Sequence, residues 1–116
     1  MDLRVDDGVA RITINRPEVL NALDEELIDQ LDARLDEALA TPNLKAIVLA
    51  ATGKAWVAGA DISFFVRNIE AGDIDRIVAF TEGGHRVLKK IESAPVPVVA
   101  RIHGMTLGGG VELALA

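Results

Sequence analysis

Two short apolar runs, residues 46–50 and 96–102, constrain the fold of this sequence more than any other feature. Neither run shows a regular polar alternation, which is typical of strands buried on both faces. Apolar residues at helical spacing precede the first run at 23–39 and separate the two runs at 73–92. Strands that alternate with helices favour an α/β fold.

The N-terminal segment predicts a β-hairpin followed by a long helix. Residues 9–14 alternate, and Asp7-Gly8 is a dipeptide that tight hairpin turns favour. Pro17 ends the second strand because proline has no N–H for a strand ladder. We expect Asn21 to be the N-cap of the helix, with acidic residues in the first turn. A leucine then recurs at every fourth position: Leu23, Leu27, Leu31, Leu35 and Leu39.

Charge and composition exclude several classes of binding partner and site. The formal net charge is −6 and no basic patch is present, which argues against nucleic acid or an anionic membrane surface. The absence of cysteine excludes disulfides, thiol catalysis and thiolate metal sites. No cluster of His, Asp and Glu has metal-ligand spacing, so no metal is predicted. No signal-peptide pattern or membrane-length apolar run is seen, and a cytoplasmic protein is expected.

The length and the C-terminal segment bear on domain organisation. A chain of 116 residues suffices for one domain. The last helical segment begins at Val111 with an apolar face, and it lacks a glycine or lysine stop. We therefore expect residues 1–116 to be the N-terminal part of a single domain, truncated after Ala116.

Two loops of small residues follow predicted strands, at residues 55–62 and 104–112. Small side chains allow backbone N–H groups to approach a ligand closely. If the loops lie side by side, one N–H from each could hold a single oxygen atom as an oxyanion hole, where one donor is worth about 3–4 kcal/mol of barrier. The alternative is that these glycines only serve tight turns.

At these residues the sequence resembles the enoyl-CoA hydratase/isomerase (crotonase) family. The motifs stand in the family's order: Asn15-Arg16-Pro17 with Asn21-Ala22-Leu23, then Ala58-Gly59-Ala60-Asp61, then Gly108 to Ala116. The resemblance implies an α/β, crotonase-like spiral of β-β-α units, incomplete at the C-terminus. It also implies an acyl-CoA substrate, with no cofactor besides the coenzyme A that the substrate carries. The amides of Ala60 and Gly109 would hold the thioester carbonyl.

The resemblance assigns roles to further residues. Glu112 matches the first of two catalytic glutamates in the hydratases, and the second would lie beyond residue 116. Ser63 departs from the family, because many members carry a basic residue there. The positions that match coenzyme A contacts are Leu20, Lys54, Ala58, Ala60, Asp61 and Ile62.

Several of these and other residues have simpler structural explanations. Asp61 is expected to be a helix N-cap that shapes its loop. Trp56 is expected to pack in the core, and His103 to hydrogen-bond the backbone. His85 lies in a charged helical stretch and is expected to be solvated. Glu112, taken alone, suits a helix first turn for electrostatic reasons.

The function that we predict is hydration of a trans-2-enoyl-CoA by syn addition of water, in fatty acid β-oxidation or related acyl-CoA catabolism. The alternative within the family is a Δ3,Δ2-enoyl-CoA isomerase or another acyl-CoA enzyme. A nucleotide-binding module is disfavoured, since residues 104–110 lack both G-x-G-x-x-G and a P-loop ending. The fragment alone is expected to be inactive. The parent is expected to be a trimer-based homo-oligomer, and residues 64–90 resemble hydratase modules fused to a hydroxyacyl-CoA dehydrogenase.

Overall fold

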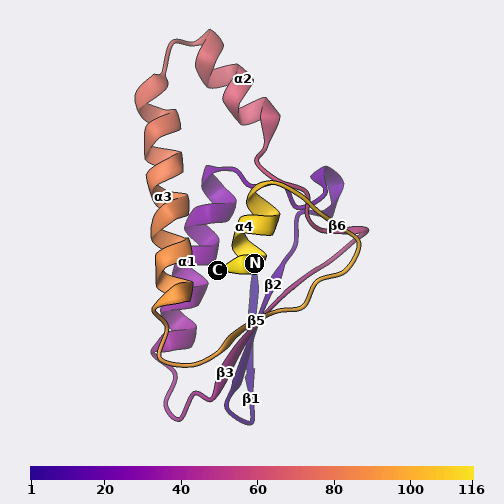
Figure 1. Cartoon of the computed structure of the whole chain (residues 1–116), viewed down its shortest axis with the longest axis vertical. Coiled ribbons are helices and arrows are strands. Elements are labelled where there is room, and N and C mark those ends of the chain that lie inside the picture. The colour runs from indigo at the N-terminus through magenta and orange to yellow at the C-terminus, as the bar shows by residue number, and fades with distance from the viewer.

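The computed structural model describes all 116 residues, and three β-β-α units follow one another along the chain (Figure 1). The second unit ends in two helices, and a short 3-10 turn precedes the first helix. The elements are β1 (Asp2–Asp6), β2 (Val9–Ile14), η1 (Pro17–Val19), α1 (Glu25–Leu39), β3 (Ala46–Ala51), β4 (Ala55–Val57), α2 (Ile62–Glu70), α3 (Ile74–Glu92), β5 (Val98–Ala100), β6 (Met105–Thr106) and α4 (Gly109–Leu115).

The strands form two sheets. The larger sheet has the order β1-β2-β3-β5, in which β1 and β2 are antiparallel and the pairs β2–β3 and β3–β5 are parallel. The smaller sheet is the parallel pair of β4 and β6. The second and third units therefore each place their first strand in the large sheet and their second strand in the small one. This arrangement is the predicted spiral of β-β-α units in an α/β fold.

The leucine stripe of α1 forms the centre of the core. Leu27, Leu31 and Leu35 are buried on α1, and Leu23 is buried just before the helix begins. Figure 1 shows α1 lying between the large sheet and α3, and side chains from all three meet in one cluster of 16 buried residues. Each fully buried leucine contributes about 1.5–3 kcal/mol to folding, so the predicted stripe is confirmed as the main core element.

The β1–β2 hairpin is confirmed together with its turn. Asp7 and Gly8 both have positive φ, at 51° and 80°. Positive φ at both central residues defines a type I′ turn, whose twist matches that of paired strands.

The expectation that Asn21 caps α1 is wrong. Asp24 is the N-cap, and its side chain accepts a hydrogen bond from the Leu27 amide at 2.9 Å. Asn21 lies three residues earlier with φ 57° and is fully buried. A residue in that position serves the preceding loop, because the helix has not yet begun.

The loops and the second apolar run also differ from expectation. The small-residue segments contain the short strands β4 and β6, and α2 forms where no helix was predicted. The run at 96–102 yields only the three-residue strand β5, which pairs with β3 alone and leaves Val99 49% exposed. The prediction of a fully buried strand is therefore wrong for β5. None of the helices has both the length and the apolar composition of a membrane-spanning segment.

Charged side chains fasten α3 to α1. Lys90 contacts both Asp32 and Asp36, the latter at 2.6 Å, and Arg76 pairs with Glu25 at 2.7 Å nearer the other end of α3. Burial alone would lower the pKa of Lys90, but the hydrogen bonds from Lys90 to the two carboxylates raise that pKa above 10.5. The position of α3 matters because α3 forms one wall of the cleft described below.

Candidate active site

The two small-residue loops meet in space. The amide of Leu107 donates to the carbonyl of Val57 at 3.1 Å, which joins the end of β6 to the end of β4. Gly110 packs directly on the same carbonyl, where an added Cβ would lie only 2.1 Å from the oxygen. Only glycine allows α4 to begin this close to β4.

The amides of Ala60 and Gly109 are the two predicted oxyanion donors. A Cβ placed on Gly109 would lie 4.0 Å from the Ala60 nitrogen, and an amide nitrogen lies roughly 2.5 Å from the Cβ position of its own residue. The two nitrogens are therefore less than about 7 Å apart. Neither amide donates a hydrogen bond to a carbonyl of the chain. Two unpaired donors thus lie in the same small region.

A mainly apolar cleft of about 240 Å³ opens beside these amides. It lies between α1, α3, α4 and the loop that ends at Asp61. The exposed carboxylate of Glu112, in the first turn of α4, is the only acidic group in its lining. The lining residues are Leu23, Ile28, Leu31, Ala60, Phe80, Thr81, Gly84, His85, Val87, Leu88, Gly109, Glu112 and Leu113.

Backbone hydrogen bonds hold the first loop against the segment before α1. The Ala58 amide donates to Leu20 at 3.1 Å, and the Leu23 amide donates to Gly59 at 2.8 Å. The Asp61 amide then donates to Leu23 at 2.8 Å. Because the Gly59 carbonyl, which shares a peptide group with the Ala60 amide, and the Asp61 amide both bond to Leu23, the Ala60 amide has a fixed position.

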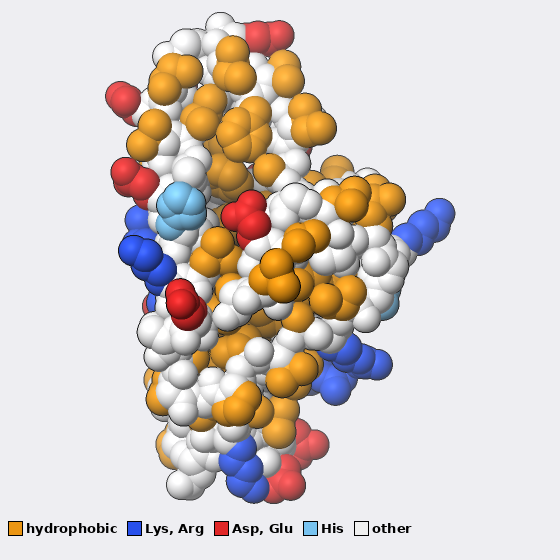
Figure 2. All heavy atoms as spheres, in the orientation of Figure 1, with side chains coloured by type: hydrophobic (Ala, Val, Ile, Leu, Met, Phe, Trp, Pro, Cys, Tyr) orange, Lys and Arg blue, Asp and Glu red, His pale blue; other side chains and the backbone are white.

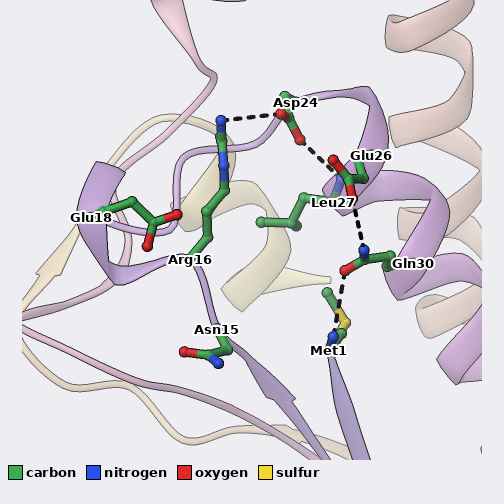
Figure 3. A pocket seen from close by; sticks show the side chains of 8 residues that line it. All are labelled: Met1, Asn15, Arg16, Glu18, Asp24, Glu26, Leu27 and Gln30. Carbon is green, nitrogen blue, oxygen red and sulfur yellow. Dashed lines mark hydrogen bonds and ion pairs between the residues drawn. The ribbon is translucent and has the colours of Figure 1, made fainter.

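Arg16 ties this loop to the start of α1. Its guanidinium lies 2.9 Å from the Asp61 carboxylate, 2.9 Å from the Ala22 carbonyl and 3.1 Å from the Asp24 carboxylate. Figure 3 shows Arg16 reaching toward Asp24 across a polar hollow of about 220 Å³ beside the start of α1. The other oxygen of Asp61 accepts from the Ser63 amide at 2.9 Å, so Asp61 is the N-cap of α2, as expected.

The buried Asp61 carboxylate remains ionised because of these contacts. Burial by itself would raise the pKa of Asp61. The hydrogen bond from Arg16, the backbone N–H of Ser63 and the positive charge of Arg16 outweigh burial and hold the pKa below 3.8. The carboxylate of Asp61 therefore holds the loop in place.

Asn21 supports the same region from the interior. Its side-chain oxygen accepts from the Arg16 amide at 2.7 Å, and its side-chain nitrogen donates to the carbonyls of Thr52 and Ala55 at 2.8 and 3.0 Å. Sequence reasoning missed the positioning roles of both Arg16 and Asn21. Their fixed spacing within the first motif was the available indication, but nothing in that spacing showed what the side chains would contact.

The residues expected to contact coenzyme A divide into two groups. Five of the six lie on or beside the first loop, with Ile62 77% exposed and Asp61 buried: these are Leu20, Ala58, Ala60, Asp61 and Ile62. Lys54 is exposed and does not line the cleft. It lies just before β4, where Gly104 approaches the Lys54 carbonyl so closely that a Cβ on Gly104 would be 2.0 Å from the carbonyl oxygen.

The structural explanations given for Trp56 and His103 are confirmed. Trp56 is fully buried, and its indole N–H donates to the Leu49 carbonyl at 3.3 Å. The Nε2 atom of His103 donates to the Gly53 carbonyl at 2.7 Å. His85 is exposed, as expected, but it also lines the cleft on the α3 side.

The arrangement has a specific chemical capacity. Two unpaired N–H groups stabilise negative charge that develops on an oxygen atom, and they do so most effectively in a site that excludes water. Glu112 places a proton acceptor in the same cleft. No group of three or more His, Cys, Asp or Glu side chains is positioned to hold a metal ion.

Comparison with known proteins places this geometry in context. Residues 9–116 match the family model described as enoyl-CoA hydratase/isomerase. The chain is 36% identical over 116 residues to a protein named "Probable enoyl-CoA hydratase" from Bacillus subtilis (strain 168). It is 42% identical over 116 residues to the fatty acid oxidation complex subunit alpha of Shewanella amazonensis.

Solved structures agree with the fold. The chain superposes on an enoyl-CoA hydratase from Rhodobacter sphaeroides with a TM-score of 0.87 at 34% identity, covering 96% of this chain and 33% of that one. An enoyl-CoA hydratase/isomerase from Xanthobacter autotrophicus gives 0.85 at 33% identity, with 97% and 42% covered. The chain spans 43% of the length of the Bacillus relative and 16% of the Shewanella relative.

Proposed function

Because the chain belongs to the enoyl-CoA hydratase/isomerase family, we propose that it is the N-terminal part of a crotonase-like domain that hydrates enoyl-CoA thioesters. The substrate is a trans-2-enoyl-CoA, and water adds syn across its double bond. The observation that carries the proposal is the pair of unpaired amides at Ala60 and Gly109, with the Glu112 carboxylate in the same cleft.

The proposed steps follow from where charge develops. The oxygen of water bonds to the β-carbon, and the electrons of the double bond move onto the thioester oxygen as an enolate. The amides of Ala60 and Gly109 stabilise this oxyanion more than the ground-state carbonyl, which lowers the barrier. Glu112 holds the water or accepts its proton. The α-carbon then takes up a proton, and the carbonyl re-forms.

Three further proposals accompany this function. Leu20, Lys54, Ala58, Ala60, Asp61 and Ile62 contact coenzyme A, mostly through backbone atoms. The full-length protein is a homo-oligomer built from trimers. The full-length protein is fused to a hydroxyacyl-CoA dehydrogenase, a proposal that the similarity to the Shewanella fatty acid oxidation complex subunit alpha supports.

A kinetic series in the full-length protein tests the proposed function. Glu112→Gln keeps size and hydrogen bonding but removes proton transfer, so we expect hydration of a four-carbon enoyl-CoA to fall about 100- to 10,000-fold. Binding of a saturated acyl-CoA, measured by calorimetry, should change little. Glu92→Gln, an exposed glutamate at the end of α3, is the matched control and should leave both quantities unchanged.

A pair of variants at Gly109 distinguishes loss of its N–H donor from the steric effect of an added side chain. An added Cβ at Gly109 would meet the end of the Leu23 side chain at 2.9 Å, and both Gly109→Ala and Gly109→Pro introduce that atom. Only proline removes the N–H, and the first helical position otherwise tolerates proline. Hydration should therefore fall about 100-fold further in Gly109→Pro than in Gly109→Ala. Equal hydration rates in Gly109→Ala and Gly109→Pro would show that the Gly109 amide is not an oxyanion donor. A wild-type hydration rate in Glu112→Gln would favour the isomerase alternative.

A further inference from the structure

Gly84 lies at a position in α3 where a glycine does not stabilise the helix. It is an interior residue of α3, and glycine is among the least favourable residues there. Its backbone does not have a positive φ. A Cβ placed on Gly84 would meet no atom within 4 Å. Neither helix geometry nor packing within the chain explains the missing side chain.

The neighbouring Gly83 provides a contrast. Gly83 is buried, and a Cβ there would lie 3.5 Å from both the Ile28 and Arg86 side chains. It therefore occupies the packed contact between α3 and α1, and it does not line the cleft. Gly84 is turned toward the cleft, beside Thr81, His85 and Leu88 on the same helix.

The cleft joins the oxyanion donors to this wall. Ala60 and Gly109 lie at one side, and α3 supplies Phe80, Val87 and Leu88 at the other. The volume of about 240 Å³ is below the roughly 300–1,000 Å³ that encloses a drug-sized ligand. Such a cleft suits one part of a ligand, and its apolar lining suits a hydrocarbon chain. An acyl group whose carbonyl accepted from the two amides would extend into the cleft along α3.

We propose that Gly84 sets the acyl-chain length that this site accepts. The absent side chain leaves open a section of the α3 wall, and the hydrocarbon beyond the reacting carbons occupies that space. This inference rests on the proposed function, because it takes the ligand of the two amides to be an acyl thioester. The two amides and Glu112 act at the reacting carbons, so they do not select for chain length, and the inference assigns that selectivity to Gly84.

The test compares chain lengths in the full-length protein. We expect Gly84→Leu to lower kcat/KM for a ten-carbon enoyl-CoA about 10- to 200-fold relative to a four-carbon one, the range that a hydrophobic pocket gives for small changes in fit. Gly83→Ala is the matched control, since it makes the same helix-favouring change away from the cleft, and its ratio of the two substrates should equal that of wild type. Gly84→Ala should melt at or above the wild-type temperature because alanine favours the helix.

The outcomes distinguish this inference from the proposed function. An unchanged ratio in a folded Gly84→Leu variant, or an equal loss for both substrates, overturns the role of Gly84 while the hydratase function stands. If wild type hydrates neither thioester, the proposed function fails. Calorimetric binding of saturated four- and ten-carbon acyl-CoA to the same variants then decides the inference: selective loss of the longer ligand supports it, and no selectivity overturns it.

Discussion

Arg16 joins three segments that lie apart in the sequence. Its guanidinium contacts the carbonyl that precedes α1, the N-cap of α1 at Asp24 and the N-cap of α2 at Asp61. The side chain is 28% exposed and that of Asp61 11% exposed, so solvent screens this pair less than an open surface pair. An arginine suits this position, because its planar fork of donors contacts several oxygens at once.

Removing this guanidinium should destabilise the protein in a pH-dependent way. We expect Arg16→Met to lower the free energy of unfolding by about 1.5–3 kcal/mol at pH 7, the range for hydrogen bonds to charged groups. The folded-state pKa of Asp61 is depressed, so its stabilisation is present above about pH 3.8 and is lost as the pH falls through the folded pKa. The difference between variant and wild type should therefore shrink below pH 3.8 in urea titrations of the full-length protein.

Arg4 offers the matched control for this prediction. It pairs with Asp2 at 3.2 Å, but both side chains are more than half exposed, at 82% and 57%. Exposed pairs contribute little to stability, and Arg4→Met should leave the unfolding curves close to those of wild type. A penalty for Arg16→Met that stays constant from pH 7 to pH 2.5 would show that the Asp61 contact is not its source.

At the scale of elements, α4 depends on how closely it approaches β4. Gly110→Ala would place a Cβ 2.1 Å from the Val57 carbonyl oxygen and 3.0 Å from the Val57 side chain. Backbone cannot yield as a flexible side chain does, so we expect a loss of about 1–3 kcal/mol or more in stability. Melting of the full-length protein measures this loss. Gly83→Ala, whose Cβ makes only ordinary contacts at 3.5 Å, should melt at or above the wild-type temperature, and a similar drop in both variants would contradict the steric explanation.

The elements differ in how well the sequence predicted them. The α1 stripe and the hairpin turn were predictable because periodicity and dihedral preference are local properties. The strands β4 and β6 have three and two residues and exist through pairing with each other, which no local pattern records. The helix α2 was missed although its cap at Asp61 was identified, because its nine residues are fewer than the roughly 11–18 over which helical periodicity is read.

The candidate site was predictable to a similar extent. The small residues of both loops predicted an oxyanion hole, and the family resemblance assigned Ala60, Gly109 and Glu112 to it; their catalytic roles stay predictions. The network around Arg16 and Asn21 was not predictable, since the Arg16 side chain contacts a carboxylate 45 residues away and the Asn21 side chain contacts a backbone carbonyl 34 residues away. The opening beside Gly84 likewise requires knowing which face of α3 meets the cleft.

At the scale of the whole molecule, large apolar side chains remain uncovered. Figure 2 shows them gathered over the projecting arm that α2 and α3 form. On α2, Ile62, Val66 and Ile69 are 77%, 46% and 60% exposed. Exposed apolar surface of this kind is typical of a face that packs against another protein segment, which agrees with the proposed homo-oligomer.

The 116-residue chain by itself should therefore associate at micromolar concentration. Size-exclusion chromatography with light scattering should give a mass above that of one chain, because association removes apolar area from water. Replacing Ile62 and Ile69 together by glutamate should shift the distribution toward the monomer. The control is the double variant Asp2→Glu/Glu92→Asp, whose two positions are exposed and already charged. It should leave the distribution of masses unchanged. A monomer with one cooperative melting transition would refute this expectation.

The strand order of the large sheet has a consequence for how the protein is made. In the order β1-β2-β3-β5, each strand after β1 pairs with one that precedes it in the chain, and the sheet widens at a single edge. A chain leaving the ribosome therefore meets an existing partner each time a new strand of this sheet emerges, and domains generally fold from the N-terminus as they are synthesised. No strand of the large sheet has to enter between two that are already paired, so translation and assembly can advance together.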